Sequence, residues 1–148
     1  MELKDLIVWQ KAWVFRNEIS AFAKKLPSQE KYKLVDQIVR SSRSISANIA
    51  EGHGRFHYQE NTQFCRIAWG SLVETFDHLT VALDENYLSP PEYNRLVLLF
   101  EELKKLINGY IKYLQTRKNQ GWFISKLTFY QFHFSTLSLF TSYSFTLY

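Results

Sequence analysis

Four segments within the first 120 residues carry apolar side chains at alternating steps of three and four, and this spacing constrains the fold most. Such steps place the side chains on one face of an α-helix. The clearest stripe predicts a helix over about residues 5–26 and contains Val8, Ala12, Phe15, Ile19, Phe22 and Leu26. Pro27 then ends this helix, because proline lacks the N–H that a further turn requires.

A second helix is expected over about residues 30–51, with Ser28 as its N-cap. The second half of its inward face is small or polar, where a core helix normally carries large apolar side chains. Gly52 and Gly54 are expected to break the helix.

A third helix is predicted over about residues 59–86, and Gly70 inside it indicates that another backbone comes close. A fourth helix has a strong start signal, with Ser89 as N-cap, Pro90 at the first position and Glu92 completing a capping box. Its wide apolar face contains two neighbouring stripes, one of which is Leu96, Leu99, Leu103, Leu106, Tyr110 and Tyr113. Four helices joined by short turns predict an all-α fold, an antiparallel up-down four-helix bundle in residues 1–120.

The composition changes at position 121. Residues 121–148 contain ten aromatic residues, nine serines or threonines and one charged residue, Lys126. Alternation within 132–134 and 143–147 predicts strands. This extension is expected to lie outside the bundle, and we favour a frameshift or read-through into a pyrimidine-rich strand as its origin. The alternative is a genuine terminal hairpin that packs on the core or on a partner.

Charge and cysteine content restrict the classes of function. The formal net charge of +4 favours anionic partners such as nucleic acid, although weakly. The single cysteine, Cys65, excludes an internal disulfide framework and a four-cysteine zinc site. An acidic N-terminus without a long apolar run is unlike a signal peptide, and no apolar run reaches 18 residues. We therefore expect a cytoplasmic protein without a membrane partner.

Catalytic motifs are missing from the sequence. His53 and His57 lie near Glu51 and Glu60, but glycines interrupt the spacing that a helical metal site needs, so no metal is predicted. Cys65 falls on an apolar stripe and is expected to be a buried thiol. Since the chain also lacks a glycine-rich phosphate loop and a nucleophile elbow, we predict no catalytic residue, no cofactor and no enzyme activity.

Three stretches carry a resemblance to a known family, namely Leu6–Gln10, Gln37–Gly52 and Phe64–Glu74. Over about residues 3–116 the chain resembles the four-helix proteins encoded within intervening sequences of bacterial 23S ribosomal RNA genes. It is also similar to the accessory variability determinant proteins of diversity-generating retroelements. The resemblance implies a barrel-like homopentamer and a nucleic-acid-binding role, with a reverse transcriptase or another protein as a possible partner.

Basic side chains are the candidate contacts to an RNA or DNA backbone, because repetition around a ring would produce a belt of positive charge that binds phosphates. The candidates are Lys33, Arg40, Arg43, Arg55, Arg66, Lys104, Lys105 and Lys112. The alternative for these residues is a solvated surface with ion pairs to nearby acids. The corresponding alternative function is a protein-interaction scaffold without nucleic-acid binding.

The small and polar face of the second helix is expected to form a hydrogen-bond network with the third helix that fixes their register. The predicted members are Ser41, Asn48, Glu51, Ser71 and Glu74. A polar groove for a ligand is the alternative.

Overall fold

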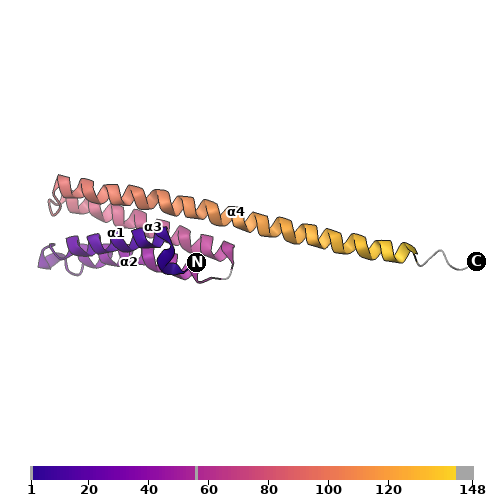
Figure 1. The fold of residues 1–148 in the computed structure, drawn as a ribbon. Coiled ribbons are helices and arrows are strands. Elements are labelled where there is room, and N and C mark those ends of the chain that lie inside the picture. The colour runs from indigo at the N-terminus through magenta and orange to yellow at the C-terminus, as the bar shows by residue number, and fades with distance from the viewer. Residues whose placement is uncertain (1, 56, 143–148) are drawn as a thin grey trace, which may run out of the picture.

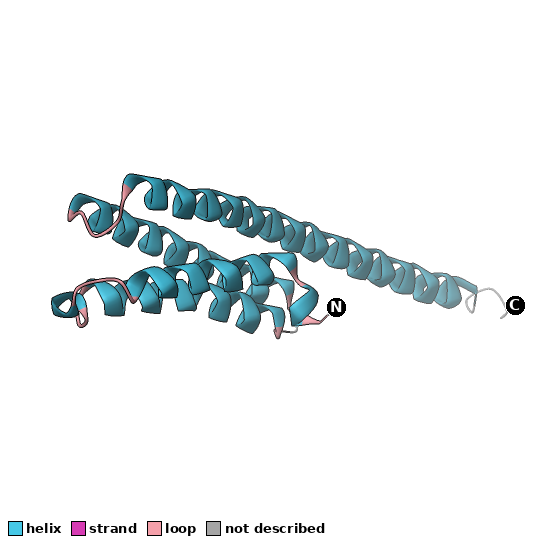
Figure 2. Cartoon of the chain, turned by 60° about the vertical axis from the view of Figure 1, so that its left-hand side comes forward, coloured by secondary structure: helices cyan, strands magenta, loops and turns pink. Residues whose placement is uncertain are grey.

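The structure is a computed structural model that describes the backbone of residues 2–55 and 57–142 and the side chains of residues 2–55 and 57–118. This part of the chain contains helices and no strand, which confirms the all-α prediction (Figures 1 and 2). In chain order the elements are η1 (Leu3–Asp5), α1 (Ile7–Ala23), η2 (Ser28–Glu30), α2 (Leu34–His53), α3 (Tyr58–Asp84) and α4 (Pro90–Ser142).

The four α-helices pack in a cycle, in which α1 contacts α2 and α4, and α3 contacts α2 and α4. The predicted stripe of α1 faces this core, since Val8, Ala12, Phe15, Ile19 and Phe22 are buried. Each large apolar side chain that is fully buried contributes about 1.5–3 kcal/mol to folding. The largest of them are Phe15, Ile19, Phe22, Ile38, Ile45, Ile49, Leu72, Leu79, Leu96, Leu103, Ile107 and Leu114.

The predicted N-cap at Ser28 is wrong. Ser28 begins the 3-10 helix η2, and α2 begins six residues later at Leu34, preceded by Lys33 without a side-chain cap. Backbone bonds of the tight turn explain the difference, because Glu30 N donates to Pro27 O and Lys31 N donates to Ser28 O.

The predicted N-cap at Ser89 and the predicted first helical position at Pro90 are confirmed. The helix begins at Pro90, and the backbone N–H of Glu92 donates to Ser89 Oγ at 3.4 Å. The carboxylate of Glu92 pairs with Lys25 Nζ at 2.8 Å. This ion pair links the start of α4 to the turn that follows α1.

The last part of α4 runs past the ends of the other three helices (Figure 1). The strand predicted within 132–134 is therefore wrong, whereas 143–147 lies outside the described residues. A helix forms its hydrogen bonds within one segment, while a strand needs a partner, and no proline or glycine interrupts residues 122–142. None of the helices in the described part has an apolar stretch sufficient to cross a membrane.

The close backbone approach occurs at Gly52 and not, within this chain, at Gly70. A Cβ atom on Gly52 would lie 2.8 Å from Asn61 Oδ1 and 2.9 Å from Phe64 Cβ, so α3 fills the space that a side chain would need. A Cβ atom on Gly70 would meet nothing within 4 Å. Gly52 lies inside α2, and Gly54 is the C-cap.

We expect Gly52→Ala to lower the free energy of unfolding by about 1–2 kcal/mol, because the cost of overpacking exceeds the gain in helix propensity. Gly109→Ala is the matched control. Gly109 is also helical, but a Cβ atom added there would have no neighbouring atom within 4 Å. The control should raise the free energy of unfolding by about 0.5–1 kcal/mol. Urea unfolding followed by circular dichroism measures both, and equal effects would contradict the assigned contact.

Candidate nucleic-acid interface

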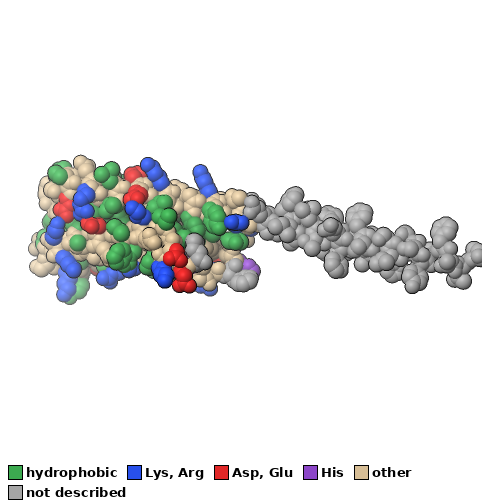
Figure 3. Space-filling model, viewed as in Figure 1, with side chains coloured by type: hydrophobic (Ala, Val, Ile, Leu, Met, Phe, Trp, Pro, Cys, Tyr) green, Lys and Arg blue, Asp and Glu red, His purple; other side chains and the backbone are tan. Residues whose placement is uncertain are grey.

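On the face shown in Figure 3, basic side chains are spread among acidic and apolar ones. Several of them pair with acids on another helix. Lys11 Nζ lies 2.7 Å from Glu102 Oε1, and Arg95 Nη1 lies 2.8 Å from Glu18 Oε2, so two ion pairs join α1 to α4. These cations serve the bundle and are less available to an external anion.

Two of the predicted contact residues also have partners within the chain. Arg55 pairs with Glu51 one turn earlier, and its guanidinium lies 4.9 Å from the centre of the Phe64 ring. Lys104 Nζ lies 3.0 Å from Glu101 Oε1 and 5.6 Å from the ring centre of Phe100. Arg55 and Lys104 therefore fit the alternative interpretation, in which a basic residue is part of a solvated surface and pairs with a nearby acid.

Arg40 and Arg43 behave differently, because among the described residues neither forms an ion pair. Both are exposed on α2 and line an open groove of about 530 Å³. We call this surface the α2 groove, and its lining residues are Lys31, Tyr32, Val35, Asp36, Val39, Arg40 and Arg43. Three cations therefore face one acid in the groove. The predicted residue Lys33 is exposed directly before α2.

Tyr32 is the most exposed aromatic or apolar side chain of the groove, with 84% of its surface accessible. Lys31 Nζ lies 5.2 Å from the centre of its ring. Sequence reasoning missed Lys31 and Tyr32, although their place directly before the basic face of α2 was visible in the sequence. A cation beside an exposed aromatic ring is a combination suited to binding phosphate and base together.

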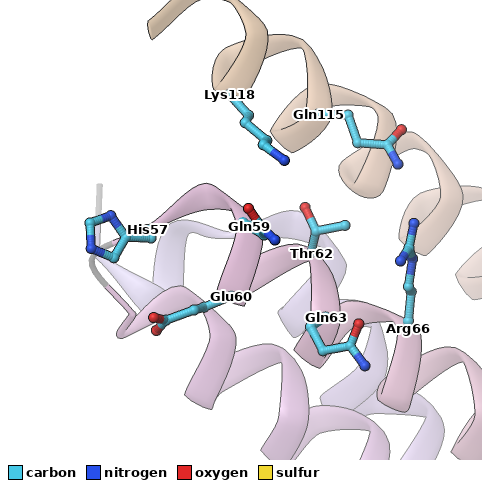
Figure 4. A pocket seen from close by; sticks show the side chains of 8 residues that line it. All are labelled: His57, Gln59, Glu60, Thr62, Gln63, Arg66, Gln115 and Lys118. Carbon is cyan, nitrogen blue, oxygen red and sulfur yellow. The ribbon is translucent and has the colours of Figure 1, made fainter. Parts of the chain in front are cut away.

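A second basic surface lies between the start of α3 and α4, in a pocket of about 630 Å³ (Figure 4). Arg66 reaches from α3 toward α4, and Lys118 reaches from α4 toward α3. Most of the remaining lining is polar and uncharged, including Gln59, Thr62 and Gln115. The predicted residue Arg66 thus acquires a second cation that sequence reasoning did not include in the candidate site.

The remaining predicted cations, Lys105 and Lys112, line neither of these two surfaces. Lys105 lines an apolar groove between the N-terminal segment and α4, together with Ile7 and Tyr113. Lys112 is exposed on α4 and lines none of the pockets described here. The eight predicted residues are therefore not gathered in one of the grooves or pockets described here.

A line of hydrogen bonds between α2 and α3, here called the polar seam, contains three predicted network residues. Ser41 Oγ lies 2.9 Å from Thr75 Oγ1, which lies 2.8 Å from the carbonyl oxygen of Ser71. Ser71 Oγ lies 2.8 Å from Ser44 Oγ, and Asn48 Nδ2 donates to Ser44 Oγ at 3.0 Å. The structure thus adds Ser44 and Thr75 to the predicted members.

The predicted network members Glu51 and Glu74 lie outside the seam, and both are exposed. Glu51 pairs with Arg55, and Glu74 Oε1 lies 3.8 Å from His78 Nε2. A carboxylate retains more hydration at the surface than in a seam of hydroxyl groups, so the polar positions inside are filled by neutral side chains.

Removal of the buried hydroxyl by Thr75→Val should lower the free energy of unfolding by about 1–2 kcal/mol, because partners in the seam lose a hydrogen bond. Thr116→Val is the matched control, since Thr116 Oγ1 makes the same bond to the carbonyl four residues earlier at an exposed site. The control should stay within about 0.5 kcal/mol of the parent. Chemical denaturation measures both, and equal losses would show that the seam adds nothing to the local bond.

The only cysteine is unsuited to nucleophilic chemistry. Cys65 is buried and lies 3.5 Å from Asn61 Oδ1, and burial raises the pKa of its thiol to about 12. The thiol therefore stays protonated at neutral pH. Among the described residues, no group of three or more histidine, cysteine or acidic side chains is placed to hold a metal ion.

Comparison with known proteins identifies relatives of the whole bundle. The profile of the 23S rRNA-intervening sequence protein family matches residues 4–109, which is 106 of the 148 residues. A similar solved structure is a protein of unknown function from the S23 ribosomal protein family of Bacteroides thetaiotaomicron, at 28% identity and a TM-score of 0.68. The similarity covers 74% of this chain and 98% of that one. No curated protein matches the chain.

Proposed function

The chain belongs to the 23S rRNA-intervening sequence protein family, and we propose that it is a non-enzymatic adaptor that binds the backbone of RNA or DNA. The observation that carries this proposal is the α2 groove. There, Arg40 and Arg43 keep their charges without an ion pair among the described residues, beside Lys31 and the exposed ring of Tyr32. Cations of this kind bind phosphates by releasing counterions.

Arg66 and Lys118 support the same function at a second surface. Their positive charges share a pocket whose other side chains are mostly neutral amides and hydroxyls able to donate hydrogen bonds to phosphate oxygens. Contacts of this type hold a nucleic acid in place without reading its sequence. The alternative function is a scaffold that binds a partner protein and uses its charges for solubility.

We propose further that the helices form an antiparallel up-down bundle and that five copies assemble as a ring. The cyclic packing of the helices supports the first point. Exposed apolar side chains on α3 support the second, namely Ile67, Val73 and Val81. The empty space at Gly70 on the same helix leaves room for a second copy to approach closely.

A pentamer predicts a particle mass of five times 17.6 kDa, about 88 kDa. Light scattering coupled to gel filtration measures this mass on the full chain. Val73→Glu together with Val81→Glu places charges on the exposed face of α3 and should reduce the mass to that of smaller species. A mass of one chain for the unmodified protein would contradict the assembly.

Arg40→Ala combined with Arg43→Ala should weaken binding to structured RNA and to duplex DNA. Because each phosphate contact contributes a slope of roughly 0.7–0.9 to the dependence of log affinity on log salt, loss of two contacts should reduce the slope by about 1.4–1.8. Fluorescence anisotropy across a salt series measures both quantities. Circular dichroism should show unchanged helix content.

The matched control is Lys25→Ala combined with Lys104→Ala. It also removes two positive charges, but these two lysines are already paired with Glu92 and Glu101. This control should bind within about twofold of the parent, because its cations are already neutralised. Equal loss in both double variants would assign binding to net charge and not to the α2 groove. Absence of binding by the parent at low salt would favour the scaffold.

We also propose that the protein acts without catalysis, as an accessory to another protein. The raised pKa of the buried Cys65 thiol removes the only cysteine as a nucleophile. A reverse transcriptase is the proposed partner, on the resemblance of the Asn48–Gly52 motif and its flanking residues to the accessory proteins of retroelements. Co-purification of the two proteins from one cell tests this partnership.

A further inference from the structure

A second type of surface lies at the end of the bundle where α2 finishes and α3 begins, on the side of α4. A cavity of about 200 Å³ opens there between α4 and the junction of α2 with α3. Its lining includes Arg55, Tyr58, Asn61, Tyr110 and Tyr113. We call this the tyrosine cavity, and it contains more aromatic side chains than the other polar pockets described above.

Two of the three tyrosines present their rings to solvent. Tyr58 is 47% exposed and Tyr113 is 48% exposed, although large aromatic side chains are usually more deeply buried. The ring of Tyr113 lies nearly parallel to that of Tyr110, with ring centres 6.2 Å apart and an angle of 13° between the planes. Stacking therefore extends from the interior toward the surface.

The inner ring is held in place. Asn61 Nδ2 donates to Tyr110 Oη at 3.1 Å, and Asn61 itself is buried against Gly52. Burial raises the pKa of Tyr110, so its hydroxyl remains protonated at neutral pH. A ring that is fixed from behind offers a stacking surface without a large loss of conformational entropy on binding.

Positive charge lies beside one of the exposed rings. The guanidinium of Arg117 lies 5.4 Å from the ring centre of Tyr113, whereas Arg55, at the edge of the cavity, is paired with Glu51. A tyrosine ring with an arginine beside it is a combination that binds single strands, in which bases stack on rings and cations contact the backbone.

We propose that the tyrosine cavity binds one unpaired base of a single-stranded RNA or DNA segment, stacked on Tyr58 or Tyr113. The volume of 200 Å³ lies below the roughly 300–1,000 Å³ of pockets for drug-sized ligands, so it suits a group of the size of one base. Bases within a duplex are paired and stacked already and cannot enter. The inference rests on the proposed function, since nucleic acid must be the ligand.

The test compares an unstructured single-stranded RNA with a duplex RNA of the same length, each labelled, on the full chain. Tyr58→Leu combined with Tyr113→Leu should weaken single-strand binding by about 5- to 160-fold, because each stacked base contributes about 1–3 kcal/mol. Duplex affinity and the salt slope should change little. The Tyr→Phe double variant keeps both rings and should bind the single strand within about twofold of the parent.

Arg40→Ala with Arg43→Ala provides the crossed control, since it should weaken single-strand and duplex binding alike. Parent-like single-strand binding by the leucine variant would overturn the tyrosine cavity and leave the proposed function standing. A parent that binds neither probe would overturn both. Should the leucine variant fail to fold, ultraviolet crosslinking of the unmodified protein decides. Crosslinks to the single strand at Tyr58 or Tyr113 support the inference, and their absence from both residues overturns it.

Discussion

The rest of the bundle depends on the close packing of α2 against α3. The side of α2 that faces α3 carries Ser41 and Ser44, whose hydroxyls lie within 2.9 Å of Thr75 Oγ1 and 2.8 Å of Ser71 Oγ, and at Gly52 no space is left for a side chain between the helices. Large apolar side chains there would force the two axes apart. Because Gly52 contacts Asn61, the same packing fixes the start of α3, from which the polar pocket and the tyrosine cavity are both built.

The number of helices and their inward faces were predictable because both follow from spacing along one segment. The start of α4 was predictable for the same reason, since Ser89 acts on the next turn. The N-cap predicted at Ser28 was wrong, because a serine after a proline is compatible with a tight turn as well as with an N-cap. The sequence does not distinguish these two roles. Gly70 predicted a close approach that does not occur within one copy of the chain, because a glycine permits such an approach without showing which backbone makes it.

The candidate site was less predictable, because availability of a cation depends on partners distant in sequence. The pair between Arg55 and Glu51 spans four residues and follows from the sequence. The pair between Lys11 and Glu102 spans 91 residues and appears only when α1 meets α4. Arg66 illustrates the opposite case, since its second cation, Lys118, lies 52 residues away and reaches the same pocket only through the packing of α4 on α3.

Because the basic surfaces are separate, an assembly of this chain would bind a nucleic acid through several small contacts on different copies. One α2 groove offers three cations against one acid, which on the proposed function would give few phosphate contacts and weak binding at physiological salt. Linked copies act at high effective concentration, so several weak contacts give strong binding to one extended ligand. A ring would therefore retain a long nucleic acid that touches several copies and release a short one. In such a ring, the scattered charge of each chain would favour ligand length over ligand sequence.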